Sequence, residues 1–360
     1  MTDSFSNSTV DTSFDPATRD RGGPAQPLLS VRGLVKHFGG RKSWRGVTTG
    51  AVRAVDGVDF DIAKGETLGV VGESGCGKST TARLVMQIIA PDAGEIVFDG
   101  EALGSRALDL TTYRREVQMV FQDSYASLNP RLTVEDTIAF GPRVHGVSKR
   151  EAMGRAHDLL FKVGLEPARF AGRYPHELSG GQRQRINIAR ALALQPRLVI
   201  LDEAVSALDK SVEAQVLNLL LDLKAEFGLT YMFISHDLNV VRFMADRVMV
   251  MYLGRVAEVG PSDVILKAPS HPYTGALLAS MPSMDPDART QEAPLSGDPP
   301  NPIDPPPGCR FHTRCRATSA ICAHVEPALA TVAGPHQVAC LMAQAGSGHP
   351  QAAPLQETAA

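Results

Sequence analysis

A glycine-rich run near residue 75 has the residue types and the spacing of a phosphate-binding loop. Gly72-Glu73-Ser74-Gly75-Cys76-Gly77-Lys78-Ser79 follows the pattern G-x-x-x-x-G-K-[ST], between a predicted strand at 67–71 and an apolar helix that reaches residue 89. Glycines let backbone N–H groups close around phosphate oxygens, and the following helix points the positive end of its dipole at them. Lys78 would neutralise phosphate charge, Ser79 would bind Mg²⁺ through its hydroxyl, and Thr80 would support the loop. The alternative is an ordinary glycine-rich turn, which the flanking strand and helix disfavour.

A second group of chemically capable residues ends a short apolar run. Leu198-Val199-Ile200-Leu201 is followed by Asp202 and Glu203. A buried strand would place both carboxylates at its C-terminal edge, where ligands collect in open α/β sheets. Asp202 suits Mg²⁺, directly or through water, and Glu203 suits polarisation of an attacking water. Two acids at a strand end are by themselves often only a solvated end, so the pair gains its meaning from the phosphate loop.

Four further segments carry a resemblance to a known family. Leu178-Ser179-Gly180-Gly181-Gln182-Arg183-Gln184-Arg185 resembles the signature of ATP-binding-cassette (ABC) ATPases. Ser206-Ala207-Leu208-Asp209 resembles the D-loop of that family, Ile234-Ser235-His236-Asp237 its switch histidine, and Phe121-Gln122-Asp123 its Q-loop. All of these occur in the family order, and His236 and Gln122 acquire functional roles only through the ordered set.

The resemblance implies ATP and Mg²⁺ as ligands and a role for each motif. Lys78, Ser79, Gln122 and Asp202 would bind phosphate and Mg²⁺, Glu203 would be the catalytic base, His236 would hold the γ-phosphate, and Asp209 would link two ATP sites. Ser179 is a good N-cap, and Gly180 and Gly181 leave N–H groups open at a helix N-terminus, which makes a second anion-binding surface with Gln182. In the resembled family two cassettes meet head to tail, so each signature seals the ATP on the phosphate loop of the other. ATP then joins the pair, and loss of the γ-phosphate lets it open.

Three details around the loop carry expectations of their own. Phe38 is the expected stacking partner for adenine, ahead of Trp44 and His37. Cys76 precedes the predicted helix, whose dipole should favour the thiolate, so alkylation is expected to block ATP binding and Mg-ATP to protect the thiol. Ala204 and Ser124 stand where many cassettes have proline, and neither change removes a functional group.

Other segments indicate a subgroup of the family. Phe121 to Arg131, Ser270-His271-Pro272-Tyr273-Thr274 and the proline-rich stretch before Gly308-Cys309 resemble the ATP-binding subunits of bacterial oligopeptide and dipeptide importers, and the chain looks closer to the second ATPase of such pairs. The resemblance implies a second, different ATPase subunit and two membrane permease subunits as partners, with a periplasmic binding protein that delivers substrate. Peptide is the expected solute. Nickel or glutathione import is an alternative, and a soluble cassette ATPase that acts on nucleic acid is a more distant one, since the paired cassettes, coiled coils or zinc knuckles of such proteins are not visible.

Four cysteines, Cys309, Cys315, Cys322 and Cys340, follow the spacing C-x5-C-x6-C-x17-C. This spacing lacks the paired C-x2-C knuckles of ordinary zinc modules. Four thiolates in a reducing compartment fit a [4Fe–4S] cluster, and the resembled importers carry matching cysteines that hold one. Zinc and unliganded structural thiols remain as alternatives. The role expected of a cluster is structural.

The elements that must position these residues alternate between short strands and helices. Runs rich in strand-forming residues at 29–38, 52–62, 67–71, 198–201, 230–234 and 247–252 predict strands. A helix that Gly228 would end carries on one face Val212, Val216, Leu219, Leu220, Leu223 and Phe227. The sequence therefore predicts an α/β fold of the P-loop NTPase, ABC-ATPase type. Its divisions are a disordered tail at 1–28, an ATPase domain at 29–260 with a helical subdomain at about 124–195, a cysteine-containing extension with a proline-rich linker at 261–342, and a disordered tail at 343–360.

Length and composition agree with that organisation. The 360 residues carry a formal charge of −3 and 43% hydrophobic residues, which allows a sizeable core and gives no net basic field for nucleic acid. No run approaches the roughly 18 apolar residues that a membrane span needs, and residues 1–10 lack the features of a secretory signal. The chain is therefore expected to stay in the cytosol, and the resemblance to importer subunits implies a peripheral position on the cytoplasmic face of the inner membrane.

Overall fold

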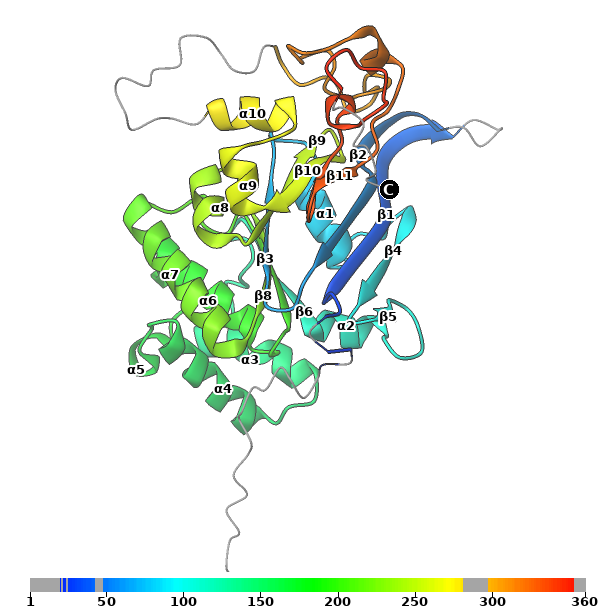
Figure 1. The fold of residues 1–360 in the computed structure, drawn as a ribbon. Helices are drawn as coiled ribbons and strands as arrows, with labels where there is room; N and C mark the ends of the chain where they lie inside the picture. Colours follow the sequence, from blue (N-terminus) through cyan, green and yellow to red (C-terminus); the bar gives the residue numbers. More distant parts are fainter. Residues whose placement is uncertain (1–19, 21, 24, 43–47, 281–296, 353–360) are drawn as a thin grey trace, which may run out of the picture.

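The phosphate loop lies between two sheets. The computed structural model describes residues 20, 22–23, 25–42, 48–280 and 297–352. An antiparallel sheet has the strand order β2-β1-β4-β5, formed by Thr48–Ile62, Leu29–Lys42, Ala93–Phe98 and Glu101–Ala102. A second sheet has the order β11-β12-β10-β9-β3-β8-β7-β6 (Figure 1). Its strands are Ala330–Ala333, His336–Val338, Arg255–Pro261, Arg247–Tyr252, Thr67–Val71, Thr230–Ile234, Leu198–Asp202 and Val117–Val120.

The centre of the larger sheet is parallel, as the alternation of strands and helices predicts. Strands β9, β3, β8, β7 and β6 pair in parallel, and β10 adds to β9 in the antiparallel sense. Connections between these strands run through α1 (Lys78–Val85), α2 (Leu110–Glu116), α7 (Lys210–Phe227) and α8 (Leu238–Met244). The α/β class is thereby confirmed, and Gly228 ends α7 in the left-handed conformation that its position predicts.

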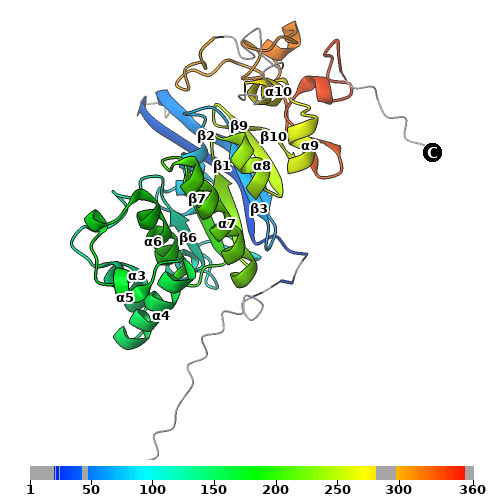
Figure 2. The same cartoon turned by 90° about the vertical axis from the view of Figure 1, so that its left-hand side faces the viewer.

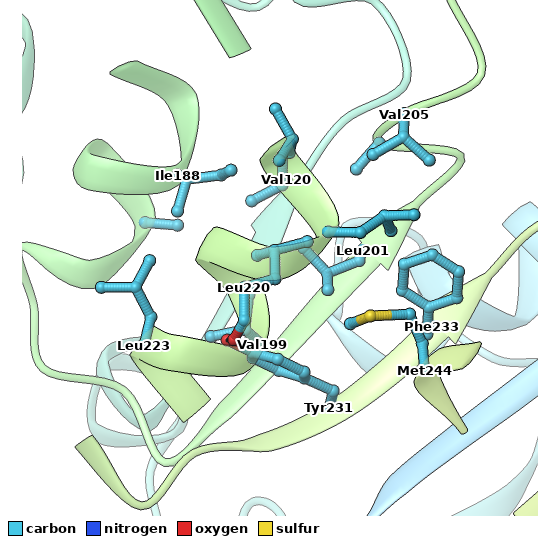
Figure 3. Close-up of a cluster of buried hydrophobic side chains, with 14 of the residues drawn as sticks. Val120, Ile188, Val199, Leu201, Val205, Leu220, Leu223, Tyr231, Phe233 and Met244 are labelled. Atoms are coloured by element: carbon cyan, nitrogen blue, oxygen red, sulfur yellow. The ribbon is translucent and has the colours of Figure 1, made fainter. Parts of the chain in front are cut away.

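Both faces of the parallel strands are buried, which explains their continuous apolar runs. Leu198 and Ile200 of β7 join a core that also holds α1 and the antiparallel sheet, whereas Val199 and Leu201 join the core on the other face. Figure 3 shows the second core, where Val199, Leu201, Tyr231 and Phe233 of β7 and β8 meet Leu220 and Leu223 of α7 and Met244 of α8. Alternate residues of one strand therefore connect two helical layers to one sheet.

Helices fill the segment between β6 and β7. They are α3 (Val134–Val144), α4 (Lys149–Lys162), the short α5 (Pro167–Phe170) and α6 (Gly180–Leu192), with a single 3-10 turn at Pro175–Glu177. They gather at one side of the sheet (Figure 2). Helix α4 lies within the segment at about 124–195 in which the sequence predicts helices.

The C-terminal region adds to the larger sheet. After α9 (Ser262–Lys267) and α10 (Pro272–Ala279), residues 297–352 form turns, 3-10 turns at Ala320–Ala323 and Leu341–Ala343, and the β11–β12 hairpin, whose Val338 pairs with Glu258 of β10. The sheet thus runs past residue 260, although the proposed domain division there stays a prediction. Of the described helices, none combines the length and hydropathy needed to cross a bilayer.

The expected tails differ partly from the structure. Leu28 is 1% exposed and its N–H donates to the Ile62 carbonyl, so the ordered chain starts before residue 29. Residues 343–352 lie in turns, and His349, which is 6% exposed, bonds the Ala317 carbonyl. The disordered tail predicted from residue 343 is therefore wrong for this stretch, because an Ala/Gln/Pro-rich composition does not reveal that one histidine has a buried carbonyl to bond. Residues 1–19, 353–360 and much of the proline-rich linker (281–296) lie outside the described residues.

Candidate functional site

The glycine-rich loop adopts a backbone that only glycine fits. Gly72, Gly75 and Gly77 have φ values of +147°, +78° and +107°. A Cβ on Gly77 would lie 2.2 Å from the Ala54 carbonyl oxygen, and one on Gly72 would lie 2.2 Å from the Met251 carbonyl oxygen. The loop is thereby pressed between β2 and β9 as it passes from β3 into α1.

The lysine and the serine of the loop face polar partners. The buried Lys78 donates to the carbonyls of Gly72 at 2.7 Å and Glu73 at 3.0 Å. Ser79 Oγ donates to Asp202 Oδ1 at 2.8 Å, across 123 residues of sequence, and Thr80 is half-buried in the first turn of α1. Burial of Asp202 raises its pKa, which a bound cation would oppose. A hydroxyl and a carboxylate oxygen side by side are ligands that Mg²⁺ accepts, so the residues present fit a magnesium ion.

Three loops converge on the carboxylate of Glu203. Gln122 Nε2 donates to Glu203 Oε2 at 2.8 Å, and His236 Nδ1 lies 3.5 Å from the same oxygen. These residues follow β6, β7 and β8, which are neighbouring parallel strands, so their carboxyl ends share one edge of the sheet. Glu203 has φ of +48°, a left-handed conformation that costs an ordinary residue about 1 kcal/mol or more and is found most often at functional sites. The arrangement can orient a water and hold its proton at one carboxylate oxygen.

The signature segment forms the start of α6, apart from α1 (Figure 1). Ser179 is the N-cap: its Oγ accepts from the Gln182 N–H at 3.3 Å, and Gln182 Oε1 accepts from the Ser179 N–H at 3.0 Å. A Cβ on Gly181 would come within 2.5 Å of Val212 of α7, so packing needs glycine there. Gly180 opens the helix, and Asp209, exposed, precedes α7 without a side-chain cap bond.

The three candidates for stacking on adenine differ in exposure and in partners. Phe38 is 38% exposed and pairs across β1 and β2 with Val52, which is two residues before the Ala54 carbonyl that covers Gly77. His37 Nε2 lies 2.9 Å from Asp56 Oδ1, so its ring is engaged elsewhere. Trp44 lies outside the described residues.

The predicted Cys76 thiolate is wrong. Cys76 is 3% exposed, and its burial raises the pKa of the thiol, outweighing the lowering effect of Lys78, whose Nζ lies 3.8 Å from Sγ. The helix dipole would favour a thiolate only if water could also reach it. The side chain instead packs in the core beneath the loop.

We therefore expect Cys76 to resist alkylation. Because its pKa lies above the ordinary 9.0, the thiol stays protonated at neutral pH, and its reaction with iodoacetamide should begin to accelerate only above about pH 9. Mass spectrometry of the native chain should show Cys76 modified far more slowly than after denaturation. Fast labelling at pH 7 that Mg-ATP suppresses would contradict this geometry.

The four C-terminal cysteines line one small hollow. Cys309, Cys315, Cys322 and Cys340 surround about 10 Å³ of free space, room for about one water, together with His312 and other residues. Burial raises the pKa of Cys309 to about 11. Within the described residues no set of three or more His, Cys, Asp or Glu side chains has an arrangement that could hold a metal ion. The side chains as placed therefore bring the thiols together without fitting an iron–sulfur cluster.

Several residues that contact the loop or its surroundings belong to no motif from which these contacts could be predicted. Glu73 bonds Arg314 and Tyr273 of the C-terminal region, and Arg310 of that region bonds the Leu253 carbonyl. The only sequence signal is indirect: Tyr273 lies in the Ser270–Thr274 segment, and both arginines lie between Cys309 and Cys315.

Comparisons with known families and structures agree with this geometry. A family model described as ABC transporter matches residues 55–206, and one described as oligopeptide/dipeptide transporter, C-terminal region, matches residues 257–322. Among solved structures, the chain is similar to the ATP-binding cassette MJ0796 bound to ADP and Pi, with TM-score 0.57 and 30% identity over 65% of this chain and 99% of that one. It is also similar to cbiO1 from Clostridium perfringens, with TM-score 0.58 and 28% identity over 68% of this chain and 92% of that one.

Curated relatives match over most of their length. A probable peptide ABC transporter ATP-binding protein of Sinorhizobium fredii is 50% identical over 89% of this chain and 92% of its own. The oligopeptide transport ATP-binding protein AppF of Bacillus subtilis is 48% identical, over 88% and 97%. The dipeptide transport ATP-binding protein DppF of Escherichia coli is 48% identical, over 88% and 94%.

Proposed function

Since this chain belongs to the ABC transporter ATP-binding proteins of the oligopeptide/dipeptide type, an ATPase family that powers peptide import, we propose that it works as one cassette of a pair that clasps ATP from two sides. ATP and Mg²⁺ are the ligands of such ATPases. The observation that carries the proposal is that Gln122 and His236 both approach one carboxylate oxygen of Glu203, the residue after the Asp202 that Ser79 contacts.

Each residue then has a task in the reaction. The backbone of the loop and Lys78 would hold the β- and γ-phosphates. Ser79 and Asp202 would hold Mg²⁺, whose charge would polarise those phosphates. Glu203 takes the proton of the attacking water and Gln122 orients that carboxylate. His236, whose side chain is 62% exposed and so can rotate, would hold the γ-phosphate.

A second cassette would complete the site. The signature at Ser179 and the phosphate loop start different helices, so one chain does not close both around one nucleotide (Figure 1). One solved relative is described as dimeric after hydrolysis. We infer the same head-to-tail geometry here, with a second, different ATPase subunit as the partner and Asp209 between the two sites.

Membrane subunits are the other partners of a peptide importer ATPase. The helical segment carries exposed apolar side chains that a permease could cover: Tyr125 at 52%, Phe140 at 59%, Val144 at 67% and Phe161 at 70% exposure. We propose that two permease chains dock there, that the chain is peripheral on the cytoplasmic face of the inner membrane, and that a periplasmic binding protein acts indirectly.

Reconstituted transport tests the function. The chain, purified from solubilised membranes, should bring down a second ATPase and two permease chains, and ATP-driven uptake by the assembly should respond to di- and oligopeptides. Uptake of nickel or glutathione but not peptide would show that the transported solute is one of these alternatives. Nucleic-acid-stimulated turnover without membrane subunits would overturn the transport proposal.

A [4Fe–4S] cluster on Cys309, Cys315, Cys322 and Cys340 is also proposed. Its support is that the four thiols line one hollow. To admit a cluster, the space between the thiols would have to widen. Anaerobic purification followed by iron and acid-labile sulfide analysis tests it, with Cys315→Ser as the ligand variant and Cys76→Ser as the control. Zinc without sulfide, or no metal, would replace the cluster with one of the two alternatives.

A further inference from the structure

Glu73, the one acidic side chain of the Gly72–Ser79 loop, is held at all three of its polar groups. Its N–H donates to Tyr273 Oη at 2.9 Å, and its carbonyl accepts from Lys78 Nζ at 3.0 Å. Its carboxylate accepts from both terminal nitrogens of Arg314, at 2.7 and 3.0 Å. Two of the three partners come from the region after residue 261, more than 190 residues further along the chain.

The partners of Glu73 are themselves fixed. Tyr273 is fully buried, and its ring lies 4.6 Å from that of Tyr252 and 5.4 Å from that of Phe311, between centroids. Arg314 has a side chain only 5% exposed and also donates to Tyr252 Oη at 3.3 Å. An aromatic cluster therefore joins the end of β9, the start of α10 and the cysteine-bearing loop, and both groups that hold Glu73 extend from it.

The negative charge of Glu73 bears directly on phosphate binding. A carboxylate in a loop that wraps phosphates would repel them, since like charges a few ångströms apart in a partly buried site interact strongly. The bidentate guanidinium cancels that charge and fixes its direction, which a lysine would do less well. The same contact steadies the Glu73 carbonyl that Lys78 touches.

We propose that Arg314 is a positioning residue for the phosphate loop: by pairing with Glu73 it neutralises the acidic side chain of the loop and sets the backbone that holds Lys78. This inference rests on the proposed ATP site. It gives the C-terminal extension a direct part in nucleotide affinity, beyond any structural role of its cysteines.

The test is a double-mutant cycle on the full chain. Arg314→Gln should weaken ATP binding, measured with a fluorescent ATP analogue, and raise KM in the assembled transporter by about tenfold, within the 5- to 150-fold range typical of coupled sites, while kcat changes less than twofold. Adding Glu73→Gln should restore affinity to within about threefold, because no negative charge is then left unpaired in the loop. If Arg314→Gln folds poorly by circular dichroism, Arg314→Lys serves as the milder variant, with a smaller shift of the same sign.

A matched control is Arg32→Gln, which removes another arginine–carboxylate pair: Arg32 Nη2 donates to both carboxylate oxygens of Asp61 on the antiparallel sheet, at 2.8 and 2.7 Å. It should leave ATP affinity unchanged. Unchanged affinity in Arg314→Gln, or a loss that Glu73→Gln does not reverse, overturns the inference. Absence of ATP binding by the parent chain would instead overturn the proposed function.

Discussion

Replacing Glu203 by Gln is expected to reduce ATP turnover by about 10²- to 10⁴-fold, the usual contribution of a positioned general base. The amide keeps the shape of the side chain but has no site for the proton of the attacking water. ATP binding should change little, because the contacts of Lys78 and the Ser79–Asp202 pair do not involve the Glu203 side chain. In the assembled transporter the variant should therefore retain unhydrolysed ATP, measured as nucleotide recovered after gel filtration, together with phosphate release.

The matched control is Glu226→Gln, which removes a carboxylate from a surface pair with Lys162 far along α7 from the ATP site. Its turnover should equal that of the parent. Turnover of Glu203→Gln near the parent rate would place the base on another residue, despite the contacts that Gln122 and His236 make with Glu203.

Removing the lysine of the loop should weaken ATP binding strongly. Lys78→Ala is expected to weaken ATP binding by roughly 100-fold, since a charge-assisted hydrogen bond to phosphate contributes up to about 3 kcal/mol and tenfold in affinity is about 1.4 kcal/mol. Lys78 is buried and already aimed into the loop, where the Gly72 and Glu73 carbonyls hold it. Calorimetry or a fluorescent analogue measures the loss directly.

Lys162→Ala provides the comparison, because it removes an amine that pairs with Glu226 on the surface of α4. It should not change ATP affinity. If Lys78→Ala and Lys162→Ala bind ATP alike, the loop does not hold the phosphates and the interpretation of Gly72–Ser79 is wrong.

Local patterns predicted the elements well because their causes are local. The run at 198–201 is apolar at every position and the run at 230–234 at every position after Thr230, as a strand buried on both faces requires, and both are strands of the parallel sheet. The glycines at 72, 75 and 77 follow from backbone angles that other residues rarely adopt. Order along the chain also indicated that Asp202 and Glu203 would reach the loop, since parallel strands end at one edge.

Other features depend on burial and on distant partners, which spacing does not encode. Cys76 stands at a helix N-terminus, yet the core covers it, and desolvation outweighs the dipole. The composition of residues 343–352 predicts a disordered tail, but His349 in this stretch bonds the Ala317 carbonyl of the extension.

The sequence alone determined the family and the fold, and it predicted the residues that would bind ATP, because a phosphate loop, its acidic strand and its signature each require particular residue types at fixed short spacings. Only the tertiary structure decided which residues far apart in the sequence contact each other. Gln122 and His236 both contact the Glu203 carboxylate, and Arg314 and Tyr273 both bond Glu73. The physical reason is that a hydrogen bond or ion pair between residues far apart in the sequence depends on how the layers pack, and packing is a property of the whole chain rather than of any segment.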